Sequence, residues 1–285
     1  MATGAETVTT DANFIPEVWS KGVYENLKKK LVFANLVTRY DSDVKNAGDT
    51  IHVVKPSQES ARDKTGNSDV TFDTFTDSKV DIAIDKHKYV AKVVEDIVKV
   101  QSQFDVRGIY EKEIGYALAN AIDTSLAALE SDVTTNVVSA GAALEDAEII
   151  TAIEYLDVLD VDRDDRFFVI HPEAMADILA LDKFTRYDAT GSAAVQTGAN
   201  NGLIADAYGV KVYMTSNIVT DTAVTPDHLQ NLLFHKSAFA LALQQAPKME
   251  AEYSVDKIGW KILGHTIYGV KTLDETRAVN VTVST

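Results

Sequence analysis

The sequence contains no cysteine, and only two of its 285 residues are tryptophan. Without cysteine there is no disulfide framework and no thiol chemistry. Basic residues are also scarce, because 27 Lys and Arg stand against 43 Asp and Glu, which gives a formal net charge of −16. An acidic surface repels phosphate groups unless basic groups are clustered locally. Sequence-specific nucleic-acid binding is therefore not expected.

Long apolar runs are absent as well. No stretch approaches the roughly 20 apolar residues that a membrane span needs. The first residues, Met1 to Glu6, have neither the basic n-region nor the apolar h-region of a signal peptide. We therefore expect a soluble protein that is made inside the cell and has no membrane partner. Its length suits one large domain or two smaller ones.

A long polar loop is the most informative segment that is present. It runs from Gly48 to Val94, and strand-like alternation marks Ile51–Val54 and Val80–Ile84. Between them, residues 57–69 include no apolar residue larger than alanine. Because a two-stranded arm is only marginally stable in water, we expect this arm to rest on another protein. Such an arm is typical of a chain that assembles.

Two helices are expected in the first half of the chain. The first helix is expected to begin at Pro16 and to end near Leu31. Lys28–Lys30 lie at its end, and they are either solvated there or contact nucleic acid or an acidic neighbour. The capping-box spacing of Ser102–Asp105 predicts a second helix from there to Asp132, about 40 Å long. Its apolar stripe consists of Tyr110, Ile114, Leu118, Ile122, Leu126 and Leu129.

The second half begins after a boundary at residues 138–142. Helix and strand patterns alternate there, which predicts an α/β-type subdomain. We expect helices at 146–159 and 172–181, and strands at 166–170 and 210–214. The long loop expected at 185–201 is either functional or mobile. Further strands are expected at 232–234, 249–255 and 278–283.

Candidate metal and catalytic patterns are weak. Asp160, Asp162 and Asp164 occupy the first, third and fifth positions of a calcium loop, but Asp165 replaces the turn glycine and His171 the final glutamate. None of the six histidines has zinc-helix spacing, and neither 191–194 nor 198–202 completes a nucleophile or phosphate motif. We expect no enzyme activity, no catalytic residues, no metal and no cofactor, and we interpret residues 160–165 as a solvated turn.

Several segments, in their order along the chain, resemble one family. In the first third these are Asn13–Trp19, Leu31–Val37 and Gly48–Val53; later come Gly202–Ile204, Tyr208–Asn217, Leu233–Ala242 and Tyr268–Lys271. Together they are similar to the major capsid proteins of tailed phages, over nearly the whole chain.

The resemblance implies an α+β fold of the Hong Kong 97 type. Its parts would be an N-arm and first helix at 1–45, an E-loop at 46–95, a spine helix and P-domain at 96–140, an A-domain at 141–231, and returning A-domain and P-domain strands at 232–285. It also implies that the protein self-assembles into hexamers and pentamers of an icosahedral phage head enclosing double-stranded DNA. An encapsulin-like compartment shell is the alternative.

The implied partners are further copies of the chain, a scaffolding protein, a portal protein and non-specific contact with packaged DNA, and a decoration protein is a further candidate. Only about fifteen residues precede Pro16, whereas some relatives carry a long scaffold-like extension. Either a separate scaffolding protein is therefore implied or such an extension has been removed, and the initiator Met1 favours the separate protein. The expected location is the virion capsid, assembled in the host cytoplasm. The Lys–Asn crosslink of some relatives is not carried over to Lys64, because no Asn partner or catalytic Glu can be matched.

Five residues are predicted to lie at subunit interfaces. Trp19 belongs to an apolar stripe that needs a covering surface, while Phe72 and Phe75 either dock on their own domain or insert into a neighbour. Arg62 and Lys64 supply positive charge near the loop tip, and subunits of net charge −16 require basic groups at their contacts.

Overall fold

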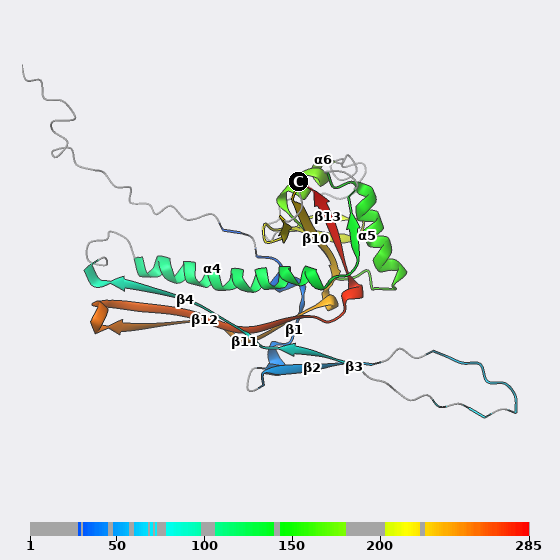
Figure 1. Ribbon diagram of the computed structural model, residues 1–285, viewed down its shortest axis with the longest axis horizontal. Coiled ribbons are helices and arrows are strands. Elements are labelled where there is room, and N and C mark those ends of the chain that lie inside the picture. Colours follow the sequence, from blue (N-terminus) through cyan, green and yellow to red (C-terminus); the bar gives the residue numbers. More distant parts are fainter. Residues whose placement is uncertain are drawn as a thin grey trace, which may run out of the picture.

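The computed structural model describes most of the chain in two lobes and one projecting arm (Figure 1). Trp19, Phe75, the capping box at 102–105, the loop at 185–201 and most of the expected first helix lie outside the described residues. Among the described residues, no helix combines the length and apolarity needed to cross a membrane. The described ranges are 28–29, 31–44, 48–56, 60–67, 69–70, 72, 78–97, 106–139, 143–180, 203–222 and 226–284.

The first lobe, which we call the spine lobe, is one long helix on a four-stranded sheet. Helix α4 spans Val106–Ala127, 22 residues and hence about 33 Å, and continues as the 3-10 helix η1, Ala128–Asp132. Its apolar stripe is confirmed from Ile114 onward, because Ile114, Leu118, Ile122 and Leu126 are buried. The sheet has the order β1-β11-β12-β4, with bounds Thr38–Arg39, Phe239–Ser254, Gly259–Thr272 and Lys86–Glu95.

Helix α4 lies close to strand β12. The Tyr268 hydroxyl donates to the backbone oxygen of Ala121 at 3.1 Å and lies 2.8 Å from Ser125 Oγ, so the ring is buried between strand and helix. At Gly264 the approach is close, since an added Cβ would overlap Ile114 Cγ2. The absence of a side chain at Gly264 is therefore what allows the helix to pack on the sheet.

We expect Gly264→Ala to destabilise the subunit by about 1–3 kcal/mol, because the added methyl group must push Ile114 out of its place. Thermal unfolding followed by circular dichroism measures this as a lower Tm. Gly66→Ala is the matched control, since an added Cβ there meets no atom within 4 Å. Equal Tm values for the two variants would contradict this account of the helix–sheet contact.

The second lobe, which we call the sheet lobe, is built on a seven-stranded mixed sheet. Along the main path the order is β5-β13-β10-β6-β8-β7, and β9 pairs with β10. β6 and β8, on either side of α6 in the sequence, are parallel, as the alternating pattern predicts. The strands are β5 Asn136–Val138, β6 Arg166–Ile170, β7 Leu203–Ala207, β8 Val210–Met214, β9 Thr220–Asp221, β10 His228–His235 and β13 Ala278–Ser284.

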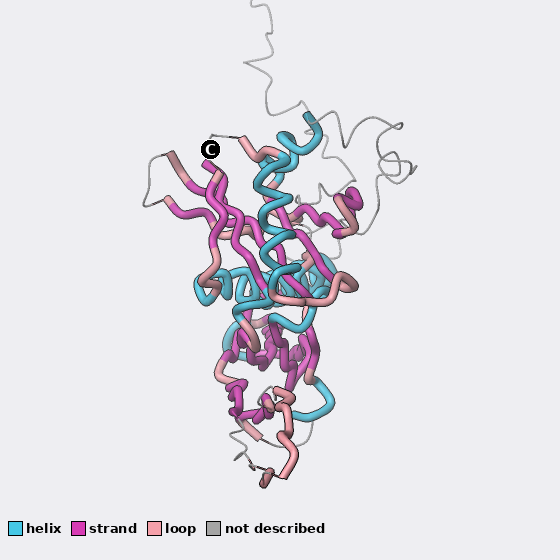
Figure 2. Tube along the Cα trace, turned by 90° about the vertical axis from the view of Figure 1, so that its right-hand side faces the viewer, coloured by secondary structure: helices cyan, strands magenta, loops and turns pink. Residues whose placement is uncertain are grey.

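Helices α5 and α6 cover one face of this sheet (Figure 2). Helix α5 spans Asp146–Val158 and begins with a capping box between Glu145 and Glu148, and α6 spans Pro172–Ala180. Both agree with the helices expected from the sequence. Apolar residues of the helices and of alternate strand positions form one buried cluster that includes Ile149, Leu156, Ile178, Phe168, Leu233 and Val281.

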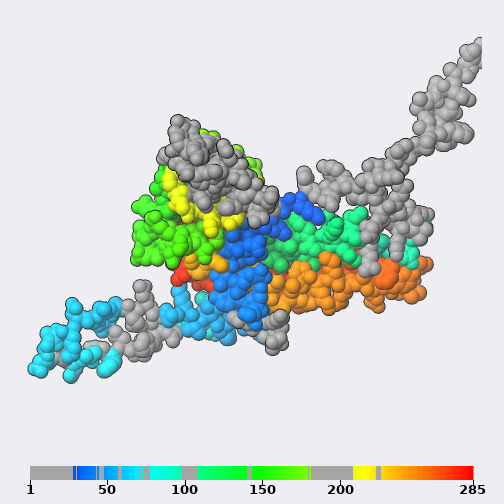
Figure 3. All heavy atoms as spheres, turned by 180° about the vertical axis from the view of Figure 1, so that it is seen from behind, coloured from blue at the N-terminus to red at the C-terminus, as the bar shows by residue number. Residues whose placement is uncertain are grey.

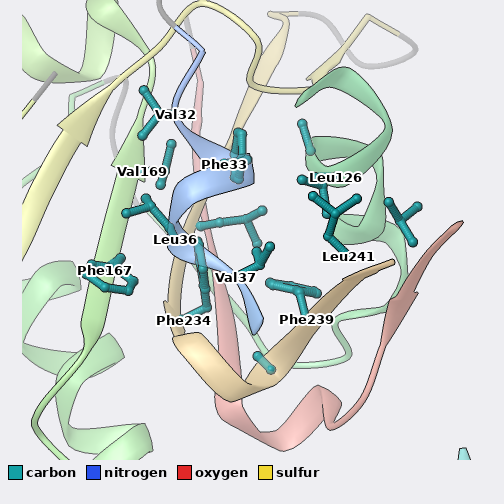
Figure 4. Packing of buried hydrophobic residues seen from close by; sticks show 14 of the residues in the cluster. Val32, Phe33, Leu36, Val37, Leu126, Phe167, Val169, Phe234, Phe239 and Leu241 are labelled. Carbon is teal, nitrogen blue, oxygen red and sulfur yellow. The ribbon is translucent and has the colours of Figure 1, made fainter. Parts of the chain in front are cut away.

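A second core joins the two lobes (Figure 4). The short helix α1, Phe33–Leu36, lies between the other face of the sheet and the end of α4. Phe234 stacks on Phe33 at 6.3 Å between centroids and meets Phe239 edge-on at 5.2 Å. The 3-10 turns η3, Lys236–Ala238, and η5, Glu275–Arg277, carry the chain between the lobes. This shared core fixes the two lobes relative to each other.

The third part is the arm, of which the structure describes residues 48–56, 60–67, 69–70, 72 and 78–83, and it projects away from both lobes (Figures 1 and 3). Strands β2, Thr50–Lys55, and β3, Ser78–Ala83, pair antiparallel as the alternation predicts, and helix α2, Asp41–Val44, lies at the root. Strand β4 does not extend the arm but pairs with β12 over its length. Strand β12 and its hairpin with β11, which turns at η4, Val255–Lys257, were not expected from the sequence.

Candidate functional site

The root of the arm is fastened to the body at several points. Lys55 Nζ binds Asp274 Oδ2 at 3.0 Å, and Gln244 Nε2 donates to the backbone oxygen of Gly48 at 3.0 Å. The pKa of Asp274 is lowered: burial alone would raise it, but hydrogen bonds from Thr276 and Lys55 outweigh burial by favouring the charged carboxylate. Ile82 is fully buried against β11. These contacts at the base of β2 and β3 therefore fix the direction in which the arm leaves the body.

The outer part of the arm is exposed. Residues 60–67, which include Arg62 and Lys64, are all exposed. The side chain of Phe72 is 91% exposed, so within the subunit it does not dock on its own domain. Of the five predicted interface residues, the structure brings Arg62, Lys64 and Phe72 onto this one projecting arm, whereas Trp19 and Phe75 lie outside the described residues.

A second apolar surface lies at the free end of the spine lobe. Val93, Ile97, Val255 and Ile258 are 49%, 58%, 79% and 67% exposed. Ile258 has φ +44°, a left-handed conformation that is unusual for a β-branched residue. Its backbone oxygen accepts from Asp96 N at 3.0 Å, which ties the η4 turn to the end of β4. Sequence reasoning missed this surface, because its residues are brought together by the β11–β12 hairpin.

A third surface lies on α5 in the sheet lobe. Ile150, Tyr155, Val158 and Leu159 are exposed there, beside Tyr208 of the β7–β8 turn. They were missed because the regular spacing of α5 indicates only its buried face. Ile150 and Val158 stand four residues before and after Glu154, so all three lie along one polar-facing side of the helix, and this spacing was the signal that could have revealed the second face.

The acidic turn expected at residues 160–165 is held by two arginines. Arg166, with its side chain 1% exposed, binds Asp157 at 2.8 Å and donates to the backbone oxygen of Asp162. Arg163 binds the other oxygen of Asp157 at 2.6 Å. These hydrogen bonds lower the pKa of Asp157. Across the described ranges, no group of three or more His, Cys, Asp or Glu side chains is placed to hold a metal ion.

The chain was compared with protein families and with curated proteins. A family model described as phage capsid protein matches residues 42–285. A search of curated proteins found no match.

Solved structures from phages match over most or all of the chain. The structure from Mycobacterium phage Che8 is 29% identical, with a TM-score of 0.78, and the match covers 94% of this chain and 97% of that one. The capsid structure of cyanophage P-SCSP1u is 17% identical, with a TM-score of 0.79, over 100% and 97% of the two chains. The capsid of Ralstonia phage GP4 is 12% identical, with a TM-score of 0.74, over 100% and 97%.

Proposed function

This chain belongs to the phage capsid protein family and is a major capsid protein, and from that premise we propose how its surfaces build the shell. The fold is of the Hong Kong 97 type, and the chain self-assembles into capsid oligomers in the virion. An encapsulin-like compartment is not favoured, because the matching family and the matching solved structures are phage capsids. The role is structural, and we propose that it involves no catalysis.

The proposal divides the chain as its family does. Residues 1–45 would be the N-arm and first helix, 46–95 the E-loop, 96–140 the spine helix and P-domain, 141–231 the A-domain, and 232–285 the returning strands. The long helix on a β-sheet supports the assignment of the spine lobe to the P-domain, and the seven-stranded sheet supports that of the sheet lobe to the A-domain.

The projecting arm is the observation that carries the assembly proposal. Phe72 is 91% exposed on an arm whose root is fastened and whose outer part is polar. Burial of a phenylalanine side chain contributes roughly 1.5–3 kcal/mol. We propose that the arm lies on an adjacent subunit, where Phe72 and Phe75 are covered and Arg62 and Lys64 meet acidic groups. Trp19 would be covered at a second contact.

The further partners are part of the same proposal. Copies would form hexamers and pentamers of an icosahedral head, assembled in the host cytoplasm around a scaffolding protein and joined to a portal protein. Packaged double-stranded DNA would be touched without sequence specificity, because a subunit of net charge −16 offers few groups for phosphates. A decoration protein would bind the finished shell.

Electron microscopy and analytical sedimentation of the purified chain, alone and with the phage's scaffolding protein, test the proposal. We expect closed shells of uniform size with six-fold and five-fold capsomers. A compact monomer under every condition, with and without the scaffolding protein, would overturn it.

The charge of the arm gives a sharper test. We expect Arg62→Glu combined with Lys64→Glu to prevent assembly at low salt, because the reversed charges then repel acids of the neighbour and the Debye length grows from about 10 Å at 0.1 M to about 30 Å at 0.01 M salt. Single exposed pairs contribute only about 0–1 kcal/mol, but the contact recurs in every subunit. Far-UV circular dichroism should be unchanged.

The control keeps the charge and changes the shape, with Arg62→Lys and Lys64→Arg in one chain. We expect this control to assemble like the wild type. If the charge-reversed variant assembles at the wild-type rate and with the wild-type salt dependence, Arg62 and Lys64 are ordinary solvated residues.

A further inference from the structure

Helix α5 carries two apolar faces, and only one of them is used inside the subunit. Ile149, Ala152 and Leu156 are buried against the sheet. On the other side Ile150 and Val158 remain 45% and 74% exposed. A surface helix normally presents polar residues to solvent. Two faces of this kind on one helix indicate that the outer face is covered by something outside the subunit.

The outer face of α5 forms one wall of a groove of about 630 Å³. Tyr208 of the β7–β8 turn also lines the groove and is held in place, because its hydroxyl donates to Asp146 Oδ1 at the start of α5. Tyr208 has φ +52° and precedes Gly209 with φ +83°, so the tight β7–β8 turn also fixes it. The lining residues are Ile150, Ile153, Glu154, Asp157, Val158, Arg163 and Tyr208.

Charge decides what kind of partner the groove accepts. Helix α5 contains Asp146, Glu148, Glu154 and Asp157 and no Lys or Arg. Over residues 143–180, 203–222 and 226–235, fourteen Asp and Glu stand against three Lys and Arg. The same lobe of a second copy would therefore be repelled at this surface, whereas a basic partner would be attracted.

We propose that the groove between α5 and Tyr208 binds a basic amphipathic helix of a separate protein. Its apolar side chains would enter between Ile150, Val158 and the Tyr208 ring, as in other helix-in-groove contacts. Its Lys or Arg side chains would meet Glu154, since Asp157, the other acid that lines the groove, already binds Arg163 and Arg166. The proposal is independent of shell assembly, since binding is measured on the unassembled subunit.

The test uses a synthetic 14-residue amphipathic Leu/Lys helix, labelled with fluorescein and titrated by fluorescence anisotropy at a subunit concentration where sedimentation shows monomer. We expect Ile150→Ser with Val158→Ser to raise Kd at least tenfold, because both anchors of the groove are lost. Val93→Ser with Val255→Ser is the matched control at the free end of the spine lobe, and it should bind like the wild type. Both pairs are exposed, so circular dichroism should show folded protein in each.

Three outcomes would overturn the proposal. Equal Kd values for the two double variants would mean that the peptide binds the acidic surface without using the groove. Equal binding of a Leu/Glu peptide of the same length would remove the charge argument. If the wild type binds no peptide but self-associates, and only the groove variant loses that self-association, the occupant is a second copy of this chain.

Discussion

Deletion of residues 58–68 is expected to leave a folded subunit that forms no shells. The described part of this segment, residues 60–67, is exposed throughout, so its removal uncovers no core. The root keeps its own contacts, which include the Lys55–Asp274 ion pair and the buried Ile82. Sedimentation and electron microscopy should show free subunits, with a Tm within about 2 °C of the wild type because exposed surface residues contribute little to stability.

A second variant separates the length of the arm from its chemistry. Replacement of residues 58–68 by eleven Gly and Ser residues keeps the reach of the arm and removes its charges. We expect this variant to assemble poorly as well, because the contact depends on side chains such as Arg62 and Lys64. Intact shells from the deletion itself would show that the arm makes no contact that assembly requires.

The second large effect is expected at Asp123, which joins three parts of the chain. This carboxylate is fully buried. One oxygen accepts from the backbone N–H of Val32 at 3.1 Å and of Ala34 at 3.4 Å, and the other accepts from Asn217 Nδ2 at 2.9 Å. A single α4 side chain thus holds both the start of α1 and the 215–217 turn of the sheet lobe.

We expect Asp123→Ala to destabilise the subunit by about 3 kcal/mol, since several buried donors lose their acceptor at about 1–3 kcal/mol each. Asp123→Asn should be tolerated. Its oxygen can still accept from Val32 and Ala34. If the Asn217 side-chain amide flips, the new amide can donate to Asn217 Oδ1, which is buried and has no hydrogen-bond partner among the described residues. Thermal or urea unfolding of the two variants measures the difference.

The pH dependence gives an independent check. Burial raises the pKa of Asp123, and hydrogen bonds from Asn217 and the backbone of Ala34, Phe33 and Val32 offset this only in part. The folded state therefore binds the proton more tightly than the unfolded state, whose Asp pKa is about 3.9. The free energy of unfolding of the wild type, relative to Asp123→Asn, should rise as the pH falls from 7 to 4. A constant difference over this range would mean that the pKa of Asp123 is the same in both states.

Regular spacing made much of the fold predictable. The stripe from Ile114 to Leu126 marks α4, Pro172 marks the start of α6, and alternation marks β2 and β3. These signals are local, because each face of a helix or strand repeats within a few residues. The strands β11 and β12 were harder to predict. Each has one face partly in solvent, and β12 includes Gly264 and Gly269, so the alternation of apolar and polar residues along these strands is irregular.

The sequence by itself determined the main helices, the paired limbs of the arm and a family resemblance that the family match confirms. Its acidity and its lack of cysteine set limits on partners and chemistry. Three features were decided only by the tertiary structure. Phe72 is exposed and does not pack on its own domain, Gly264 leaves room for α4 to pack on the sheet, and Asp123 accepts hydrogen bonds from both Val32 and Asn217. The tertiary structure also revealed the groove between α5 and Tyr208. The physical reason is that these contacts join residues tens to more than a hundred positions apart, and no local period records which distant residue will fill a given space.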